Sequence, residues 1–417
     1  MLGSATNGTT RITLVIEALT SGGAQRQMLY LAQYLCEQGY KVQIVTYHLV
    51  AYDNREHFLP MLEHLEIPII SIESVGKWQR YWELRRAIKA TRPQVVISFL
   101  YLPNLLCELA RLPYSKFRLV VSERTGCVGN VQRKDRVRFQ MHRLADAVVF
   151  NSNSLREFVI GHAPWLAGRD HVITNCVDLD SFRPAEPSLS GEQCATGEKS
   201  ALRVVVAARV RPEKNALTLL EALAILRRTA PSLRVVVDWY GNDFFRNGEA
   251  TERSGHFLEL RDEISRRDME DCFRLHRPVS NLLPVYQSAT VACLPSIYES
   301  FPNAICEAMA CGLPIIASRI SDNDQLVIEG RNGYLFDPSS PAEVAGVLLR
   351  VAELPDDERR RMAAASRQLA ESLLQPKEFG KKWITLIDSL APRNRPTRWF
   401  GARRPLVRNP ERLGGDI

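Results

Sequence analysis

Two glutamates eight residues apart mark one stretch of the 417-residue chain, Leu294 to Ser318. Glu299 precedes a segment that we expect to be helical from about Phe301 to Cys311, and Glu307 lies within it. An apolar run from Thr290 to Leu294 predicts a buried strand before the loop. Free N–H groups at such a junction can hold phosphate oxygens, and carboxylates accept hydrogen bonds from sugar hydroxyls. The stretch therefore predicts a site for a nucleoside diphosphate and its attached sugar.

Two other segments carry groups that suit a diphosphate. Arg209 and Lys214 follow an expected strand at 203–208, so a guanidinium fork and an ammonium could neutralise the same phosphates. Ser21-Gly22-Gly23-Ala24 lies between an expected strand and helix, where glycine allows close approach of the backbone and the helix N-terminus favours negative charge. A solvated loop and a structural turn remain the ordinary interpretations of these two segments.

The pattern Glu299-Ser-Phe-Pro-Asn-Ala-Ile-Cys-Glu307, followed by Ala308-Met-Ala-Cys-Gly-Leu-Pro314, resembles the donor site of the retaining glycosyltransferases of family 4, the group 1 glycosyltransferases. The resemblance implies metal-independent and cofactor-free transfer of a hexosyl group from a nucleoside-diphosphate sugar, here a UDP-sugar, to an acceptor hydroxyl. The expected process is synthesis of cell-surface polysaccharide or lipid-linked saccharide. The implied catalytic residues are Glu299, Arg209 and Lys214, and the implied donor contacts are Glu307, Gly22, Gly23, Ser300, Phe301, Pro302 and Asn303.

Three motifs depart from this pattern or add to it. Many members of the family have a histidine where this chain has Ser122-Glu123-Arg124-Thr125-Gly126; we place Glu123 and Arg124 on the acceptor side, or expect them to pair with each other. Asn175-Cys176-Val177-Asp178 resembles the family's Asn-Gly-Val-Asp turn and is interpreted as structural. Asp322-Asn-Asp324 has a metal-like spacing in a loop, but the resemblance implies no metal ion.

Two other functions remain open. One is a nucleotide-sugar epimerase of the same fold, for which a product that keeps the sugar–nucleotide bond would be diagnostic. The other is a degenerate relative that binds saccharide without turnover, which the presence of both glutamates, Arg209 and Lys214 disfavours. A nicotinamide dehydrogenase is disfavoured because the glycine fingerprint of dinucleotide enzymes is missing.

Strands alternate with helices in both halves of the chain, which predicts an α/β protein with parallel sheets. By resemblance the fold is GT-B, two Rossmann-like doubly wound domains facing across a cleft. The expected divisions are an acceptor-side domain at 1–185, a polar linker at 186–200, a nucleotide-sugar-binding domain at 201–376, a helix crossing back at 377–392 and a disordered Arg-rich tail at 393–417.

Charge and composition suggest the cell compartment and partners. Nine scattered cysteines favour a reducing cytosol, and neither a signal-peptide pattern nor an apolar stretch of about 20 residues is found. Residues 1–185 hold 22 Lys+Arg against 16 Asp+Glu. Trp78, Trp82 and Arg85 share one expected helical face, and Arg133-Lys-Asp-Arg-Val-Arg138 adds a basic cluster. We therefore expect a lipid-linked or saccharide acceptor, no nucleic acid, and a cytoplasmic protein that attaches peripherally to an anionic membrane; an ordinary helix with its tryptophans in the core is the alternative.

Overall fold

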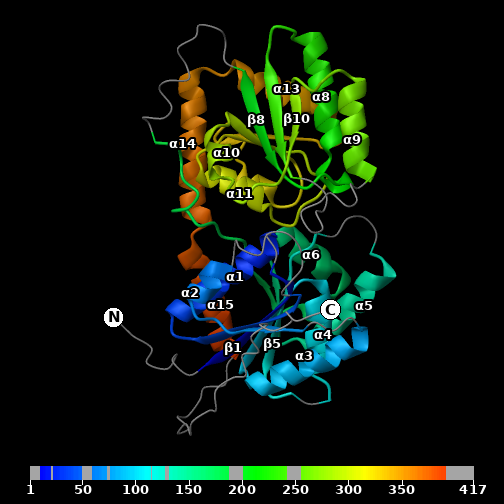
Figure 1. Ribbon diagram of the computed structural model, residues 1–417, viewed down its shortest axis with the longest axis vertical. Helices are drawn as coiled ribbons and strands as arrows, with labels where there is room; N and C mark the ends of the chain where they lie inside the picture. Colours follow the sequence, from blue (N-terminus) through cyan, green and yellow to red (C-terminus); the bar gives the residue numbers. More distant parts are fainter. Residues whose placement is uncertain are drawn as a thin grey trace, which may run out of the picture.

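The computed structural model describes residues 10–19, 22–48, 59–72, 76–113, 115–126, 131–186, 201–241 and 255–390. Two α/β domains lie one above the other in Figure 1, and each is built on a sheet of parallel strands. Alternate side chains of a strand enter different cores, as in β1, where Leu14 and Ile16 join one core and Val15 joins the other. Both faces of each sheet are therefore covered, which confirms the predicted pair of doubly wound domains.

The N-terminal sheet has seven strands in the order β3-β2-β1-β4-β5-β6-β7. Its strands are β1 (Arg11–Ala18), β2 (Lys41–His48), β3 (Ile69–Ser71), β4 (Val95–Phe99), β5 (Arg118–Glu123), β6 (Ala147–Phe150) and β7 (Asp170–Val172). Its helices are α1 (Gly23–Glu37), α2 (Leu59–His64), α3 (Lys77–Thr91), α4 (Tyr101–Ala110), α5 (Arg133–Met141) and α6 (Asn153–His162), with 3₁₀ turns η3 (His142–Leu144) and η4 (Pro164–Leu166). The strand order changes direction between β1 and β4, and ligands of such sheets bind at the carboxyl ends of the strands near this point.

The C-terminal sheet has six strands in the order β10-β9-β8-β11-β12-β13. Its strands are β8 (Leu202–Ala207), β9 (Val235–Tyr240), β10 (Phe273–His276), β11 (Val291–Leu294), β12 (Ile315–Ser318) and β13 (Gly333–Phe336). Its helices are α8 (Ala216–Thr229), α9 (Gly255–Arg266), α10 (Leu283–Gln287), α11 (Asn303–Ala310), α12 (Asn323–Leu326), α13 (Pro341–Glu353) and α14 (Asp356–Leu373), with the 3₁₀ turn η5 (Pro212–Lys214). Because β8 and β11 are paired, the loops that follow them are neighbours.

The last described helix, α15 (Pro376–Leu390), packs on the N-terminal domain, as the red helix in the lower domain of Figure 1 shows. Trp383 is fully buried and its ring stacks on Phe99 with centroids 5.9 Å apart. A Cβ on Gly380 would lie 2.1 Å from the ring of Tyr34, so this ring on α1 packs directly against the backbone of α15. The C-terminal segment thus completes the core of the first domain.

Some sequence-based predictions need correction or lie outside the described residues. Helix α11 begins at Asn303 rather than Phe301, because Pro302 has an extended ψ of 108° and serves as the N-cap instead of entering the first turn. The tail at 393–417 and linker residues 187–200 lie outside the described ranges. The described cysteines are all free thiols. Within the described ranges, no helix is long and apolar enough to span a membrane.

Candidate active site

Lys214 and Glu299 meet where the loops after β8 and β11 come together. The Lys214 ammonium forms an ion pair with Glu299 Oε1, and Ser296 Oγ donates to the same oxygen at 2.8 Å. The Ile297 N–H donates to the Glu213 carbonyl at 2.8 Å and fastens the two loops to each other. Both charged side chains remain partly accessible to solvent. Arg209 is exposed and follows the end of β8 by two residues.

Glu307 lies on α11 and is nearly buried, with 4% of its surface exposed. Its Oε1 is paired with Nη1 of Arg26, which comes from α1 of the other domain, and the Tyr286 hydroxyl lies 3.4 Å from its Oε2. Burial raises the pKa of Glu307 above the ordinary value for a glutamate, while Arg26 and the Tyr286 hydrogen bond act against this rise. The carboxylate is therefore buried, and a cation from the opposite domain favours its ionised form.

The glycine pair and the turn before α11 face each other directly. A Cβ on Gly23 would lie 2.1 Å from Asn303 Nδ2, so a side chain at this position would require the Asn303 amide to move. Asn175 Nδ2 donates to Asn303 Oδ1 at 2.8 Å and to the Phe301 carbonyl at 3.2 Å. The Ser300 hydroxyl donates a hydrogen bond to Asn151 Oδ1. No side chain within the described residues caps the N-terminus of α11. The predicted donor contacts are thus gathered at the seam between the domains, although the side chain of Phe301 is in the hydrophobic core.

The Asp322 carboxylate joins the two domains. Its Oδ2 accepts from the backbone N–H of Asn153 at 2.6 Å, and its Oδ1 accepts from that of Ser154 at 2.8 Å. These N–H groups belong to the first turn of α6, where a carboxylate is favoured by the helix dipole. The Asp322 side chain is therefore a helix cap supplied by the opposite domain.

Glu123 and Arg124 do not pair with each other, which corrects one of the two sequence-based interpretations. Glu123 is buried; its carboxylate lies 3.0 Å from His142 Nε2 and 3.4 Å from Arg138 Nη1. His142 Nδ1 lies 2.6 Å from Glu108 Oε1, so the imidazole bridges two buried carboxylates. Burial alone would lower the pKa of His142, but the hydrogen bonds to both glutamates raise it to about 9. His142 is consequently protonated at neutral pH.

Arg124 points toward the domain seam instead. Its Nη1 donates to Asn175 Oδ1 at 2.7 Å and its Nε donates to Ser122 Oγ at 3.0 Å. The guanidinium stacks over Phe99 at 4.1 Å, and burial lowers its pKa to about 9. Through Asn175 it is connected to the turn before α11. Glu123 and Arg124 therefore build two separate networks at the carboxyl end of β5.

Sequence reasoning did not identify Arg26, Asn175 or His142 as parts of these networks. For Arg26 a signal was present, since an arginine in the first turn of a helix is electrostatically unfavourable unless it has an anionic partner. Asn175 was interpreted as part of a structural turn, yet its side chain contacts Arg124 and Asn303. His142 has no local signal, because the two glutamates that it contacts lie 34 and 19 residues away.

The exposed side of α3 agrees with the prediction for its two tryptophans but not for Arg85. Trp78 and Trp82 are 78% and 60% exposed, so they are not core residues. Arg85 does not share their free face: its Nη1 donates to the Ala110 carbonyl at 3.1 Å and thereby ties α3 to the end of α4. Arg86 is the exposed basic neighbour of the tryptophans on this helix.

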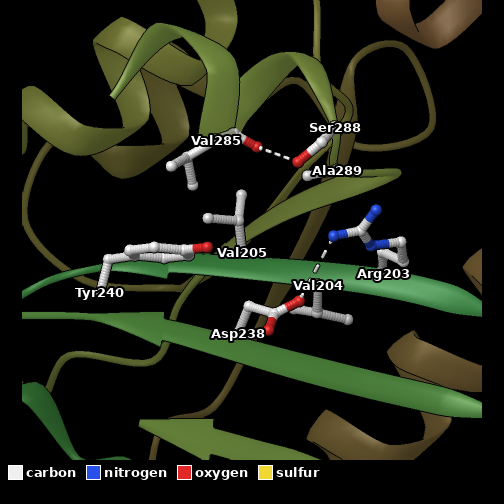
Figure 2. Close-up of a pocket in the computed structure, with 8 residues that line it drawn as sticks. All are labelled: Arg203, Val204, Val205, Asp238, Tyr240, Val285, Ser288 and Ala289. Atoms are coloured by element: carbon white, nitrogen blue, oxygen red, sulfur yellow. Dashed lines mark hydrogen bonds and ion pairs between the residues drawn. The ribbon is translucent and has the colours of Figure 1, made fainter. Parts of the chain in front are cut away.

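Figure 2 shows a separate pocket inside the C-terminal domain, between β8, β9 and α10. Its volume is about 10 Å³, which is room for at most a water molecule. Arg203 lies 3.8 Å from Asp238 across one end, and Tyr240 lies at the other. None of the predicted site residues lines it, so it is not the donor site.

The fold and the site together define an α/β transferase of two facing domains. Two protein-family models match the chain. "Glycosyltransferase Family 4" matches residues 21–181, and "Glycosyl transferases group 1" matches residues 196–369. The chain belongs to the group 1 glycosyltransferases of family 4, as its site motif indicated.

Curated relatives are similar over part of the chain. It is 30% identical over 237 residues to a D-inositol 3-phosphate glycosyltransferase of Streptomyces scabiei, covering 56% of this chain and 52% of that one. It is 32% identical over 236 residues to the protein of the same name from Xylanimonas cellulosilytica, covering 55% and 53%. The matched segments span about half the length of these relatives.

Solved structures share the GT-B fold over most of the chain. A glycosyltransferase from Rickettsia africae superposes with a TM-score of 0.75 at 17% identity, covering 91% of this chain and 98% of that chain. Anabaena HepE in complex with UDP and glucose superposes with a TM-score of 0.76 at 19% identity, covering 91% and 100%. At these identities the likeness establishes the fold.

Proposed function

We propose that the protein is a retaining glycosyltransferase that moves a sugar from a UDP-sugar to an acceptor hydroxyl, in the synthesis of cell-surface polysaccharide or a lipid-linked saccharide. The observation that carries this proposal is the Lys214–Glu299 pair, which lies at the carboxyl ends of two neighbouring strands. A cation for the leaving group and a hydrogen-bond acceptor for the sugar thus occupy one place. UDP-bound HepE, a protein of the same fold, supports the choice of donor.

The reaction follows from the chemistry of these groups. The acceptor oxygen forms a bond to the anomeric carbon while the bond from that carbon to the diphosphate oxygen breaks. Lys214, Arg209 and the N–H groups at the start of α11 stabilise the negative charge that grows on the departing diphosphate. Glu299 accepts hydrogen bonds from hydroxyls of the transferred sugar, and Glu307 does so from the ribose. The acceptor's proton passes to the departing diphosphate, and the proposed reaction uses no metal ion or cofactor.

A lipid-linked acceptor is supported by the outer surface of the N-terminal domain. Helix α4 packs between α3 and α5, so the exposed side chains of all three helices share one layer. Trp78, Trp82 and Val137 are exposed there, the last at 50%. Exposed basic residues accompany them; these are Arg86, Lys89, Arg133, Lys134 and Arg136. Indole rings can lie among lipid headgroups while arginines bind lipid phosphate, so this surface suits an anionic membrane. A protein attached there would lie close to a lipid-linked acceptor.

The test begins with donor binding and ends with product analysis. Nucleoside-diphosphate sugars with different bases are screened for thermal stabilisation, and the best donor is incubated with lipid-linked and free acceptors, D-inositol 3-phosphate among them. We expect a UDP-sugar to bind and its anomeric configuration to be kept in the product by NMR, with EDTA present. A donor isomerised at its sugar with the nucleotide still attached would indicate an epimerase. Binding of a saccharide without any turnover would indicate a degenerate relative.

A further inference from the structure

Glu307 forms an ion pair with Arg26, a residue that lies outside the donor-site motif at 299–314. Arg26 lies in the first turn of α1, three residues after Gly23, and its Nη1 is paired with Glu307 Oε1. The guanidinium carbon lies 5.8 Å from the centroid of the Phe182 ring, which limits where the side chain can go. Arg26 and Glu307 belong to different domains, so their contact joins the two domains.

We infer that Arg26 is a positioning residue for the donor: it holds the Glu307 carboxylate in the orientation that receives the ribose hydroxyls, and it does so from the opposite domain. This inference rests on the proposed function. It adds a consequence, since recognition of the ribose then depends on a contact between the two domains.

The Glu307 carboxylate has enough acceptor positions for both Arg26 and the ribose. An ionised carboxylate offers about four acceptor positions on its two oxygens. Arg26 uses one on Oε1, and the Tyr286 hydroxyl can use one on Oε2. Two positions remain for the two ribose hydroxyls, so donor binding does not require Arg26 to leave.

Arg26 also keeps this acceptor ionised. Burial raises the pKa of Glu307, and a protonated carboxyl would become a donor at one oxygen and lose part of its acceptor capacity. The other titratable groups around it have pKa values raised above their ordinary values and stay neutral up to mildly alkaline pH. They are Tyr30 on α1, Tyr286 on α10, and Cys306 and Cys311 at α11. Arg26 therefore supplies the charge that opposes burial.

The experiment measures UDP and 2′-deoxy-UDP binding by calorimetry, because the two ligands differ by one ribose hydroxyl. The wild type, Arg26→Lys, Arg26→Gln and Glu307→Gln are compared between pH 6 and 9. A hydrogen bond to a charged group is worth roughly a tenfold to hundredfold preference, so the wild type should prefer UDP by about that factor. At neutral pH the preference should collapse in Arg26→Gln and in Glu307→Gln and be largely kept in Arg26→Lys.

The pH series separates positioning from a structural role. Without Arg26 the pKa of Glu307 rises further, so the preference lost in Arg26→Gln should return as the pH is raised toward 9. Arg267→Gln is the matched control, since it breaks an ion pair with Glu221 far from the seam. An undiminished UDP preference in folded Arg26→Gln, or a loss that is the same at every pH and in Arg26→Lys, would overturn the inference alone. Failure of the wild type to bind any uridine nucleotide would overturn the proposed function and the inference with it.

Discussion

Lys214 and Glu299 form an ion pair although 85 residues separate them in the chain. The pairing of β8 with β11 brings their loops together, and both side chains stay partly accessible. In the proposed function this pair would orient each side chain before the donor binds and would hold the Lys214 ammonium beside the diphosphate. This arrangement leads to the first prediction.

Alanine at Lys214 should lower kcat by roughly a hundredfold to a thousandfold, because a contact to the developing charge is lost in the transition state. Alanine at Arg209 should lower kcat as well. The double variant should lose less than the product of the two factors, since both cations act on one diphosphate. Steady-state kinetics with Lys381→Ala, a surface lysine on α15, as control provide the measurement. Fully multiplicative losses would show that the two cations act independently.

Glu307→Gln should raise the donor KM by roughly tenfold or more while the protein remains folded. Glutamine keeps the shape of the side chain but loses the charge that ribose hydroxyls and Arg26 require. The donor KM is measured alongside Glu353→Gln, an exposed glutamate on α13. A folded Glu307→Gln protein with wild-type KM and kcat would remove Glu307 from the site.

His142→Gln should destabilise the N-terminal domain by on the order of 3–5 kcal/mol, because Glu108 and Glu123 lose the cation between them. The pKa of His142 is about 9 in the folded protein, above its value of about 6.5 in an unfolded chain. The stability that this group contributes is therefore fully present below about pH 6.5 and is lost as the pH rises toward 9.

Urea unfolding of the wild type and His142→Gln at several pH values between 6 and 9 tests this. The difference in midpoint should shrink as the pH rises. A difference that grows with pH would mean that the imidazole is neutral in the folded protein.

Replacing Trp78 and Trp82 by alanine should reduce sedimentation with anionic liposomes, since two exposed indoles are removed from the proposed membrane face. Adding alanine at Arg86 should reduce it further, by about 1 kcal/mol at low salt, and high salt should weaken binding of the wild type. Arg85 is left unchanged because it ties α3 to α4. Leu373→Ala, which removes an exposed apolar side chain from α14, is the control. Equal partitioning of all these proteins, or no binding at low salt, would favour an acceptor in solution.

The fold was predictable because it depends on local patterns. Apolar runs such as Val95–Phe99 alternate with helical segments, and strands buried on both faces predict parallel sheets. The motif around Glu299 and Glu307 was predictable for a similar reason, since a strand, a loop and a helix N-terminus follow one another directly in the chain.

The contacts between distant segments were not predictable in this way. Arg26 meets Glu307 across 281 residues, and no pattern near either residue specifies the other. On α3, Trp78 and Trp82 form one apolar stripe while Leu84 and Ile88 form another. Helical periodicity detects both stripes, but only packing against the sheet decides that Leu84 and Ile88 are buried.

The return of α15 to the first domain affects how the protein is made. Trp383 and Phe379 belong to the same core as Phe99 and the strands of the N-terminal sheet. A ribosome synthesises those strands first, but the side chains that fill this core emerge only after the whole second domain. An apolar surface of the N-terminal domain, on α1, therefore stays exposed during translation until α15 has been synthesised. We expect it to be the domain that depends on chaperones, and a chain cut after α14 to aggregate through that surface.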